Sequence, residues 1–185
     1  MDNGAGSYRR FLNGDDNGIT EIIRDYKDGL MLFINRYVNN IHIAEELTED
    51  TFFKLVTKKP KFTENNSFKT WLYTIGRNTA LNYIKHNRNI AKTSLEELKN
   101  LCADKECVEK SYLRKEQKLQ LNGALAEIGS NYAMVLHLKY FEDMSNEQIA
   151  QVFKKNKRQV ENMLYQAKQA LKTELKKEDF IYENL

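Results

Sequence analysis

Apolar side chains recur every three to four residues along most of the chain, which is the spacing of one face of an α-helix. The stripes predict three long helices in the first half, over residues 18–39, 42–58 and 68–88. The third helix carries Trp71 on its apolar side, so we interpret Trp71 as a core residue rather than a platform for stacking a base. Tyr73 lies on the opposite side and is predicted to be exposed.

The periodic pattern stops over residues 89–111, where charges are scattered and no apolar stripe continues. We interpret this stretch as a linker. Helices are predicted again over 113–128 and 132–141. Two further helices are expected to begin at capping-box patterns, in which a polar cap residue is followed three positions later by Gln. These patterns are Ser145-x-x-Gln148 and Asn156-x-x-Gln159.

The predicted fold class is therefore all-α, with two small helical domains joined by a flexible linker. A single Pro and only 8 Gly among 185 residues agree with long helices rather than a turn-rich sheet protein. We place the domains at residues 1–92 and 113–185 and the linker at 93–112.

Composition narrows the function classes. No apolar run approaches the roughly 18 residues that a membrane span needs, and the N-terminus lacks the pattern of a secretory signal, so we expect a cytoplasmic protein without membrane insertion. Cys102 and Cys107 are expected to be reduced thiols. The histidines are too scattered for a metal site or a catalytic triad. We therefore expect no enzyme activity, no metal and no cofactor.

Basic residues gather in two blocks of an otherwise mildly acidic chain. Residues 61–93 contain 6 basic and 1 acidic side chains, and residues 154–177 contain 8 and 2. The segments before each block carry an acidic excess. Two separate basic blocks are expected of a protein with two nucleic-acid contacts, although charge alone is equally compatible with two solvated helix faces.

Residues 145–168 have the spacing of a helix-turn-helix. Ala150 is small where two helices must cross closely, and Val160 lies ten residues further on, where the second helix needs an apolar residue facing the first. The segment 154–158 is strongly basic and covers the turn and the start of the second helix. A helix N-terminus of this kind can enter the major groove of DNA.

Three segments resemble the extracytoplasmic-function (ECF) group of sigma-70 family RNA polymerase sigma factors. Residues 44–52, AEELTEDTF, are similar to the family's region 2.1–2.2, and residues 68–78, FKTWLYTIGRN, are similar to its region 2.3–2.4. Residues 145–171 align with the helix-turn-helix of region 4. The three occur in the family's order and with similar spacing, which is more specific than any one of them.

The resemblance implies a protein that binds core RNA polymerase, recognises the minus-35 and minus-10 promoter elements and promotes DNA melting. The contact with the clamp helices of the largest polymerase subunit would use the acidic residues Glu45, Glu46, Glu49 and Asp50. The minus-10 element would be bound as a single strand by Asn65, Asn66, Ser67, Tyr73, Arg77, Asn78, Lys85 and Arg88. The minus-35 duplex would be bound by Lys154, Lys155, Asn156, Lys157, Arg158, Glu161, Asn162 and Lys168.

The chain departs from the family pattern at some of these positions. Lys154 stands where the family usually has Gly, so the turn is expected to accept a positive φ at Lys154 or to change its shape. Met163 and Gln166 stand where the family often has Arg, which would weaken phosphate anchoring by the last helix.

The partners implied are core polymerase and promoter DNA, and the resemblance leaves room for an anti-sigma factor. It also implies that the DNA-binding surfaces are hidden until polymerase separates the domains. One alternative is a helix-turn-helix regulator that binds duplex DNA without polymerase, which would leave the acidic helix and the 68–88 helix without a role. Another is a helical adaptor that has lost DNA binding, as Met163 and Gln166 allow.

Overall fold

The computed structural model describes residues 3–63, 66–93 and 121–177. Within these ranges all regular secondary structure is α-helical and no strand is present, which confirms the predicted fold class. Residues 121–127 are helical and precede α6. The named helices are α1 (Asn3–Leu12), α2 (Asn17–Val38), α3 (Ile41–Lys58), α4 (Phe68–Thr93), α6 (Ser130–Tyr140), α7 (Asn146–Phe153) and α8 (Lys157–Lys177).

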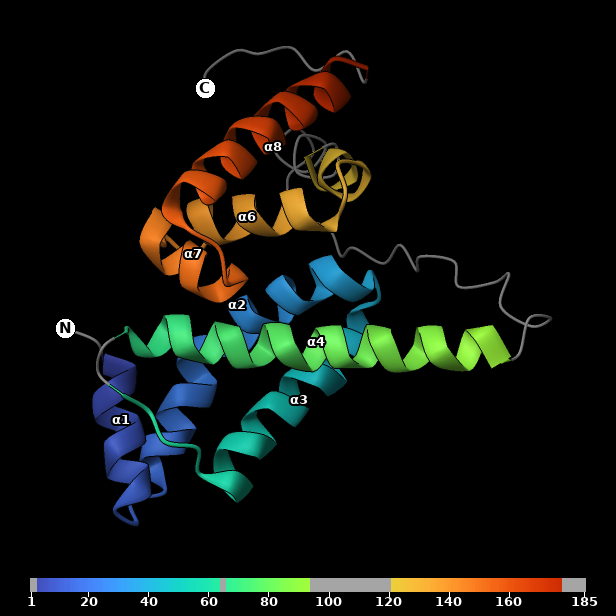
Figure 1. Ribbon diagram of the computed structural model, residues 1–185. Helices are drawn as coiled ribbons and strands as arrows, with labels where there is room; N and C mark the ends of the chain where they lie inside the picture. Colours follow the sequence, from blue (N-terminus) through green and yellow to red (C-terminus); the bar gives the residue numbers. More distant parts are fainter. Residues whose placement is uncertain (1–2, 64–65, 94–120, 178–185) are drawn as a thin grey trace, which may run out of the picture.

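The long helix α4 crosses the middle of the molecule (Figure 1). In this view α1 and α3 lie below α4 and α2 crosses behind it, and the four helices form the N-terminal bundle, residues 3–93. Helices α6, α7 and α8 lie on the other side and belong to the C-terminal unit, residues 121–177. Because α7 packs on α4 and α6 packs on α2, buried side chains of both halves join in one continuous core.

The core of the N-terminal bundle follows the predicted apolar stripes. Leu30 and Phe33 of α2, Leu55 of α3 and Leu72 of α4 are fully buried. The predicted helices agree with α2 and α3 to within one or two residues at each end, and α4 runs five residues beyond its predicted end. Burial of these side chains supplies most of the helix stability, since isolated helices of this length are marginal.

Local polar contacts set the helix boundaries. Asn39 ends α2 with a φ of 49°, a conformation that Asn tolerates better than most residues. The side chain of Asn40 then accepts hydrogen bonds from the first free amides of α3. At the start of α4, the hydroxyl of Ser67 accepts the amide hydrogen of Thr70 at 3.2 Å. Ser67 is therefore the cap of this helix.

Helix α1 was not predicted. Its sequence, NGAGSYRRFL, contains two Gly residues and a short apolar pattern, both of which disfavour an isolated helix. Tertiary packing stabilises this helix despite its low intrinsic helix propensity, because Tyr8 and Phe11 are buried against the bundle. At the crossing of α1 and α2 a Cβ on Gly18 would lie 2.2 Å from the carbonyl oxygen of Ser7, so only Gly permits this approach.

Both capping boxes of the C-terminal unit are present. The hydroxyl of Ser145 accepts the amide of Gln148 at 3.2 Å, and the Gln148 side chain accepts the amide of Ser145 at 2.8 Å. Asn156 and Gln159 make the same reciprocal pair at 2.8 and 3.0 Å. Lys154, between the two helices, has a φ of 54°, as expected for a residue in a turn where the family has Gly.

In the ranges described, none of the helices combines the length and the apolar character needed to cross a membrane.

Candidate functional site

The acidic residues predicted to contact polymerase lie together on α3. Glu45, Glu46, Glu49 and Asp50 are all exposed. Glu45 Oε1 lies 3.4 Å from Lys27 Nζ of α2, and both side chains are well exposed, so this ion pair contributes little stability. The carboxylates therefore remain available to a basic partner.

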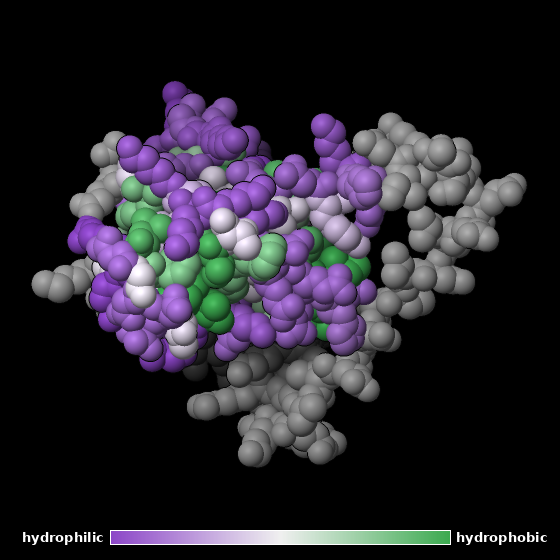
Figure 2. All heavy atoms as spheres, turned by 90° about the horizontal axis from the view of Figure 1, so that it is seen from below, coloured by the Kyte–Doolittle hydropathy of each residue, from purple (hydrophilic) through white to green (hydrophobic). Residues whose placement is uncertain are grey.

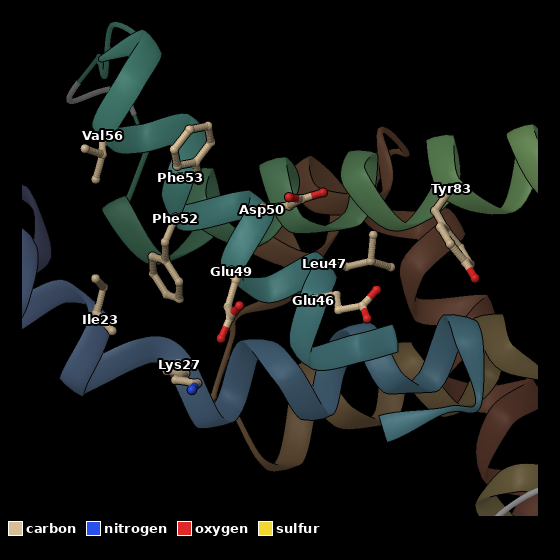
Figure 3. A pocket seen from close by; sticks show the side chains of 10 residues that line it. All are labelled: Ile23, Lys27, Glu46, Leu47, Glu49, Asp50, Phe52, Phe53, Val56 and Tyr83. Atoms are coloured by element: carbon tan, nitrogen blue, oxygen red, sulfur yellow. The ribbon is translucent and has the colours of Figure 1, made fainter. Parts of the chain in front are cut away.

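An apolar groove accompanies these carboxylates, and the sequence did not predict it. The groove has a volume of about 780 Å³. It is lined by Ile23, Lys27, Glu46, Leu47, Glu49, Asp50, Phe52, Phe53, Val56 and Tyr83, which come from α2, α3 and α4 (Figure 3). The signal that could have indicated it is the pair Phe52-Phe53, since two consecutive Phe residues cannot both face one core.

The two Phe residues have different environments. Phe52 is buried, whereas Phe53 is 66% exposed, and Val56 is 40% exposed. Seen from below in Figure 2, apolar side chains gather in the middle of this face and hydrophilic ones surround them. An apolar surface rimmed by carboxylates suits a helix that carries apolar and basic side chains.

The residues predicted to bind single-stranded DNA have unequal accessibility. Asn66 and Lys85 are exposed, and Asn78 is half-buried on α4. Asn65 lies outside the described residues. Arg88 belongs to α4, but its side chain lies outside the described part of the chain.

Tyr73 is fully buried, so the prediction that it is exposed is wrong. Tyr73 lies in the core between α2 and the C-terminal unit, so the stripe that put it opposite the apolar side of α4 did not identify its environment. Packing between elements that are distant in the sequence buries this side chain, and local periodicity cannot reveal such packing. The ring of Tyr73 lies 5.2 Å from that of Phe33. Burial, and secondarily the negative charge of Glu142, raise the pKa of the Tyr73 hydroxyl well above its usual range.

Other members of the predicted single-strand surface are covered by the same unit. The guanidinium of Arg77 lies over the ring of Phe153 of α7, 5.3 Å from its centroid. The hydroxyl of Ser67 accepts a hydrogen bond from the side chain of Gln148 at 3.0 Å. Ser67, Tyr73 and Arg77 therefore contact the C-terminal unit in this arrangement.

A polar cluster around Glu142 holds this junction. Lys69 Nζ of α4 lies 2.7 Å from Glu142 Oε2 and also donates to the Glu142 carbonyl at 2.8 Å. His137 Nε2 lies 3.4 Å from the other carboxylate oxygen. Burial raises the pKa of Glu142, but the donors His137, Lys69 and Tyr73 together outweigh it and lower the pKa to about 2.

Gly29 of α2 makes room for this cluster. A Cβ at Gly29 would lie 2.5 Å from Glu142 Oε1 and 2.6 Å from the Tyr73 hydroxyl. Gly in a helix interior costs about 1 kcal/mol relative to Ala. Its presence in the middle of α2 is therefore explained by the close approach of the Glu142 side chain.

The C-terminal unit presents its predicted duplex-binding residues to solvent. Lys154, Lys155, Asn156, Lys157, Arg158, Glu161, Asn162 and Lys168 are all exposed. Lys157 Nζ pairs with Glu147 Oε1 of α7 at 2.6 Å. Hydrogen bonding from Lys157 is the main cause that lowers the pKa of Glu147 to about 2.

The residues that depart from the family pattern have roles within the C-terminal unit. Met163 is half-buried against the core. The side chain of Gln166 accepts a hydrogen bond from the hydroxyl of Tyr132 at 2.9 Å, which ties α8 to α6.

Lys168, a predicted duplex-binding residue, lies next to an aromatic ring. Its Nζ is 5.4 Å from the centroid of the exposed Tyr140 ring.

Cys102 and Cys107 lie outside the described residues. Among the residues that are described, no three or more His, Cys, Asp or Glu side chains are grouped so that they could hold a metal ion.

Two family models match the chain in the order of its two halves. The model described as Sigma-70 region 2 matches residues 22–90. The model described as Sigma-70, region 4 matches residues 118–171. Together they cover most of the N-terminal bundle and the helix-turn-helix, and they leave α1 outside.

Curated relatives match over most of their own length. The chain is 26% identical over 160 residues to the RNA polymerase sigma factor YlaC of Bacillus subtilis, covering 86% of this chain and 92% of that protein. It is 23% identical over 176 residues to the ECF RNA polymerase sigma factor SigW of the same organism, covering 91% and 94%.

Solved structures share the fold. The sigma factor RpoE of Bartonella quintana, in complex with the anti-sigma factor NepR, matches with a TM-score of 0.67 and 19% identity, over 85% of this chain and 96% of that chain. CnrH in complex with the cytosolic domain of CnrY matches with a TM-score of 0.63 and 15% identity, over 94% and 95%.

Proposed function

Since the chain belongs to the ECF group of the sigma-70 family of RNA polymerase sigma factors, we propose that it directs core RNA polymerase to promoters. It binds core polymerase, recognises the minus-35 and minus-10 elements and promotes opening of the DNA. The proposed location is the bacterial cytoplasm, where the polymerase works. Binding energy rather than a reaction of its own accounts for the activity, so no catalytic residue is assigned.

The observation that carries this proposal is the apolar groove rimmed by carboxylates on α3. A regulator that bound duplex DNA alone would need the C-terminal unit and would have no use for this groove. The proposed occupant is the pair of clamp helices of the largest polymerase subunit. Phe53 and Val56 would supply apolar contact, while Glu46, Glu49 and Asp50 would face basic side chains.

The N-terminal bundle is proposed to hold the minus-10 element as a single strand. Lys85 would follow the backbone, and Asn66 would offer hydrogen bonds to an extruded base. Asn78 is half-buried on α4 and would join them after a small side-chain movement. Tyr73 would become a stacking surface only after the C-terminal unit moves away from α4.

The helix-turn-helix is proposed to bind the minus-35 element as duplex. The N-terminus of α8 places Arg158, Glu161 and Asn162 on one exposed side, where they can reach base edges. Lys154 and Lys155 in the turn would contact phosphates, which adds affinity without sequence information.

The arrangement with both halves in contact is proposed to be a resting state. Ser67, Tyr73 and Arg77 contact the C-terminal unit, so binding a single strand there requires the halves to separate. One of the similar structures is the sigma factor RpoE in complex with the anti-sigma factor NepR. On this basis an anti-sigma factor is the proposed partner that maintains the inactive state.

Run-off transcription with core polymerase tests the proposal. The wild-type chain should support promoter-dependent initiation over a library of randomised promoters. Replacing Glu46 and Asp50 by Lys should weaken core binding at least tenfold without loss of helicity, because it places two cations where carboxylates face the groove. The matched control replaces the exposed Asp25 and Glu127 by Lys, which changes net charge equally but away from the groove.

The outcomes separate the two function classes. Specific, tight duplex binding without polymerase, together with no effect of core polymerase on DNA binding, would favour an independent helix-turn-helix regulator. Equal core affinity of both charge-reversed variants would remove the assignment of the α3 groove.

A further inference from the structure

Helix α1 is fixed rigidly to α2. The carbonyl of Ser7 lies against Gly18, and the hydroxyl of Ser7 donates a hydrogen bond to Glu21 Oε2 at 2.6 Å. Arg10 forms ion pairs with Glu21 and Asp15. Backbone packing at Gly18 leaves α1 little freedom to slide or rotate, so whatever α1 contacts on its other side is also held in place.

The other side of α1 contacts the chain that leads into α4. The hydroxyl of Tyr8, a residue that is 1% exposed, donates a hydrogen bond of 2.8 Å to the carbonyl oxygen of Pro60. The Nζ of Lys59 lies 5.0 Å from the centroid of the Phe11 ring. These two contacts join residues about 50 positions apart in the sequence.

An aromatic cluster carries the same connection into α4. The ring of Trp71 lies 5.2 Å from that of Tyr8 and 5.3 Å from that of Phe62. Phe68 lies 5.6 Å from both Tyr8 and Phe62. Trp71 is half-buried and packs among these rings against the edge of the core. One end of the connection between α3 and α4 is therefore anchored at Pro60 and Phe62.

The other end of this connection carries the proposed minus-10 side chains. Ser67 caps α4 through the amide of Thr70, and Asn66 immediately before it is exposed. Asn66 thus directly precedes the capped end of α4, where Phe68 packs on Tyr8 of α1 and on Phe62. A side chain that selects a base must be held to within a fraction of an ångström. A segment without regular secondary structure lacks the repeating backbone hydrogen bonds that would hold it.

We propose that Tyr8 is a positioning residue for recognition of the minus-10 element. Its hydroxyl fixes the carbonyl of Pro60 and so holds Phe62 against Phe68 at the start of α4, two residues after Asn66. This role rests on the proposed function, and it assigns α1, which lies outside the residues matched by the region 2 model, a part in DNA selectivity.

The test compares Tyr8→Phe with Thr48→Val in the full chain assembled with core polymerase. Tyr8→Phe removes the hydrogen bond and keeps the ring. Thr48→Val removes another buried side-chain bond of the same bundle, from the Thr48 hydroxyl to the Ala44 carbonyl at 2.6 Å, in α3 and remote from this segment. Affinity is measured for single-stranded minus-10 oligonucleotides in which each base is replaced in turn, and for minus-35 duplex.

Tyr8→Phe should reduce discrimination between preferred and replaced bases by about 3- to 10-fold, the range expected for one hydrogen bond. It should leave the affinity for minus-35 duplex unchanged and speed hydrogen exchange of the amides in residues 59–63. Thr48→Val should change neither discrimination nor exchange in that segment.

Two results overturn the inference while the proposed function stands. One is wild-type discrimination in Tyr8→Phe while the wild-type holoenzyme selects bases normally. The other is an equal loss of selectivity in Thr48→Val, which would show that any destabilisation of the bundle suffices. A wild-type holoenzyme that does not bind the minus-10 single strand at all would instead reject the proposed function together with this role.

Discussion

The two surfaces proposed to contact DNA differ in accessibility. Every predicted duplex-binding residue of the C-terminal unit is exposed, whereas Ser67, Tyr73 and Arg77 of the N-terminal bundle lie against that unit. The difference indicates that the contact between the halves restricts one DNA surface far more than the other. If both surfaces bind DNA as proposed, duplex recognition can precede separation of the halves, while single-strand contacts to Ser67, Tyr73 and Arg77 must follow it.

The largest expected effect separates the two surfaces directly. Lys157→Ala with Arg158→Ala should weaken minus-35 duplex binding by about 10- to 100-fold for each base that the variant no longer contacts. For each phosphate that it no longer neutralises, the slope of log binding constant against log salt concentration should fall by about one. Asn66→Ala with Asn78→Ala should spare duplex binding and impair strand opening. The measurements are duplex affinity over a salt series, and permanganate footprinting of unpaired thymines.

A template melted in advance around the minus-10 element provides the control. It should restore part of the transcription that the Asn66/Asn78 variant fails to support, because unpairing is no longer required. It should not help the Lys157/Arg158 variant. Equal failure of both variants at every step, with equal rescue, would contradict the division between the two surfaces.

The next effect concerns the contact that covers Tyr73. Glu142→Ala should weaken the junction by about 3 kcal/mol, because it leaves the ammonium of Lys69 without its carboxylate in a largely buried site. The free protein should become more extended in small-angle scattering and should bind single-stranded DNA more tightly. Duplex binding should change little. An unchanged scattering profile would show that other contacts suffice to hold the halves together.

The lowered pKa of Glu142 predicts how the junction between the halves responds to pH. Because the pKa of Glu142 is lowered to about 2 in this arrangement, its contribution is complete above the ordinary carboxyl pKa of 4.5 and is lost as the pH falls toward 2. The scattering profile of the wild-type protein should therefore not change between about pH 6 and 8 on account of Glu142. Separation of the halves within that range, abolished by Glu142→Gln, would contradict the assignment.

A smaller effect is expected at Gly29. Gly29→Ala should raise the intrinsic stability of helix α2 by about 1 kcal/mol. The added Cβ would nevertheless displace the Glu142 carboxylate and open the junction between the halves. Gly6→Ala in α1 is the matched control, since no atom lies within 4 Å of the added Cβ. Single-strand binding by the free protein should rise in the first variant only, and thermal stability should rise in the second.

The smallest effect lies in the turn of the helix-turn-helix. Lys154→Gly should stabilise the C-terminal unit by up to about 1 kcal/mol, because the φ of 54° is strained for Lys and not for Gly. Lys155→Gly, at a position without positive φ, should not stabilise it. Chemical denaturation measures both. A stabilisation of equal size in the two variants would point to reduced charge repulsion instead of relief of strain.

Local signals were sufficient for much of the fold. The apolar stripes predicted the long helices, and the Ser145 and Asn156 patterns predicted two helix starts that the structure confirms. These features depend on neighbours within four residues, so the sequence alone specifies them. The positive φ at Lys154 is one of the two outcomes expected from the Gly that the family has there, the other being a changed turn.

Features that depend on distant packing were not accessible in this way. Helix α1 exists because Tyr8 and Phe11 are buried by other helices, in spite of its two Gly residues. Tyr73 was predicted to be exposed, but it is buried against Phe33 of α2 and beside Glu142, which is about 70 positions away in the sequence. The α3 groove likewise needs three helices before it exists.

If the C-terminal unit binds the minus-35 element as proposed, the ion pair between Lys157 and Glu147 makes that binding an exchange reaction. In the absence of DNA, the Glu147 carboxylate forms an ion pair with the Lys157 ammonium, as a phosphate would in the complex. Any duplex must displace this carboxylate before it can use Lys157, whatever its sequence. An intramolecular competitor of this kind reduces the affinity for every DNA sequence by the same factor. Only a sequence that also makes base contacts would still be bound tightly. The Glu147 carboxylate would in this way shorten the time that the protein spends on incorrect sites.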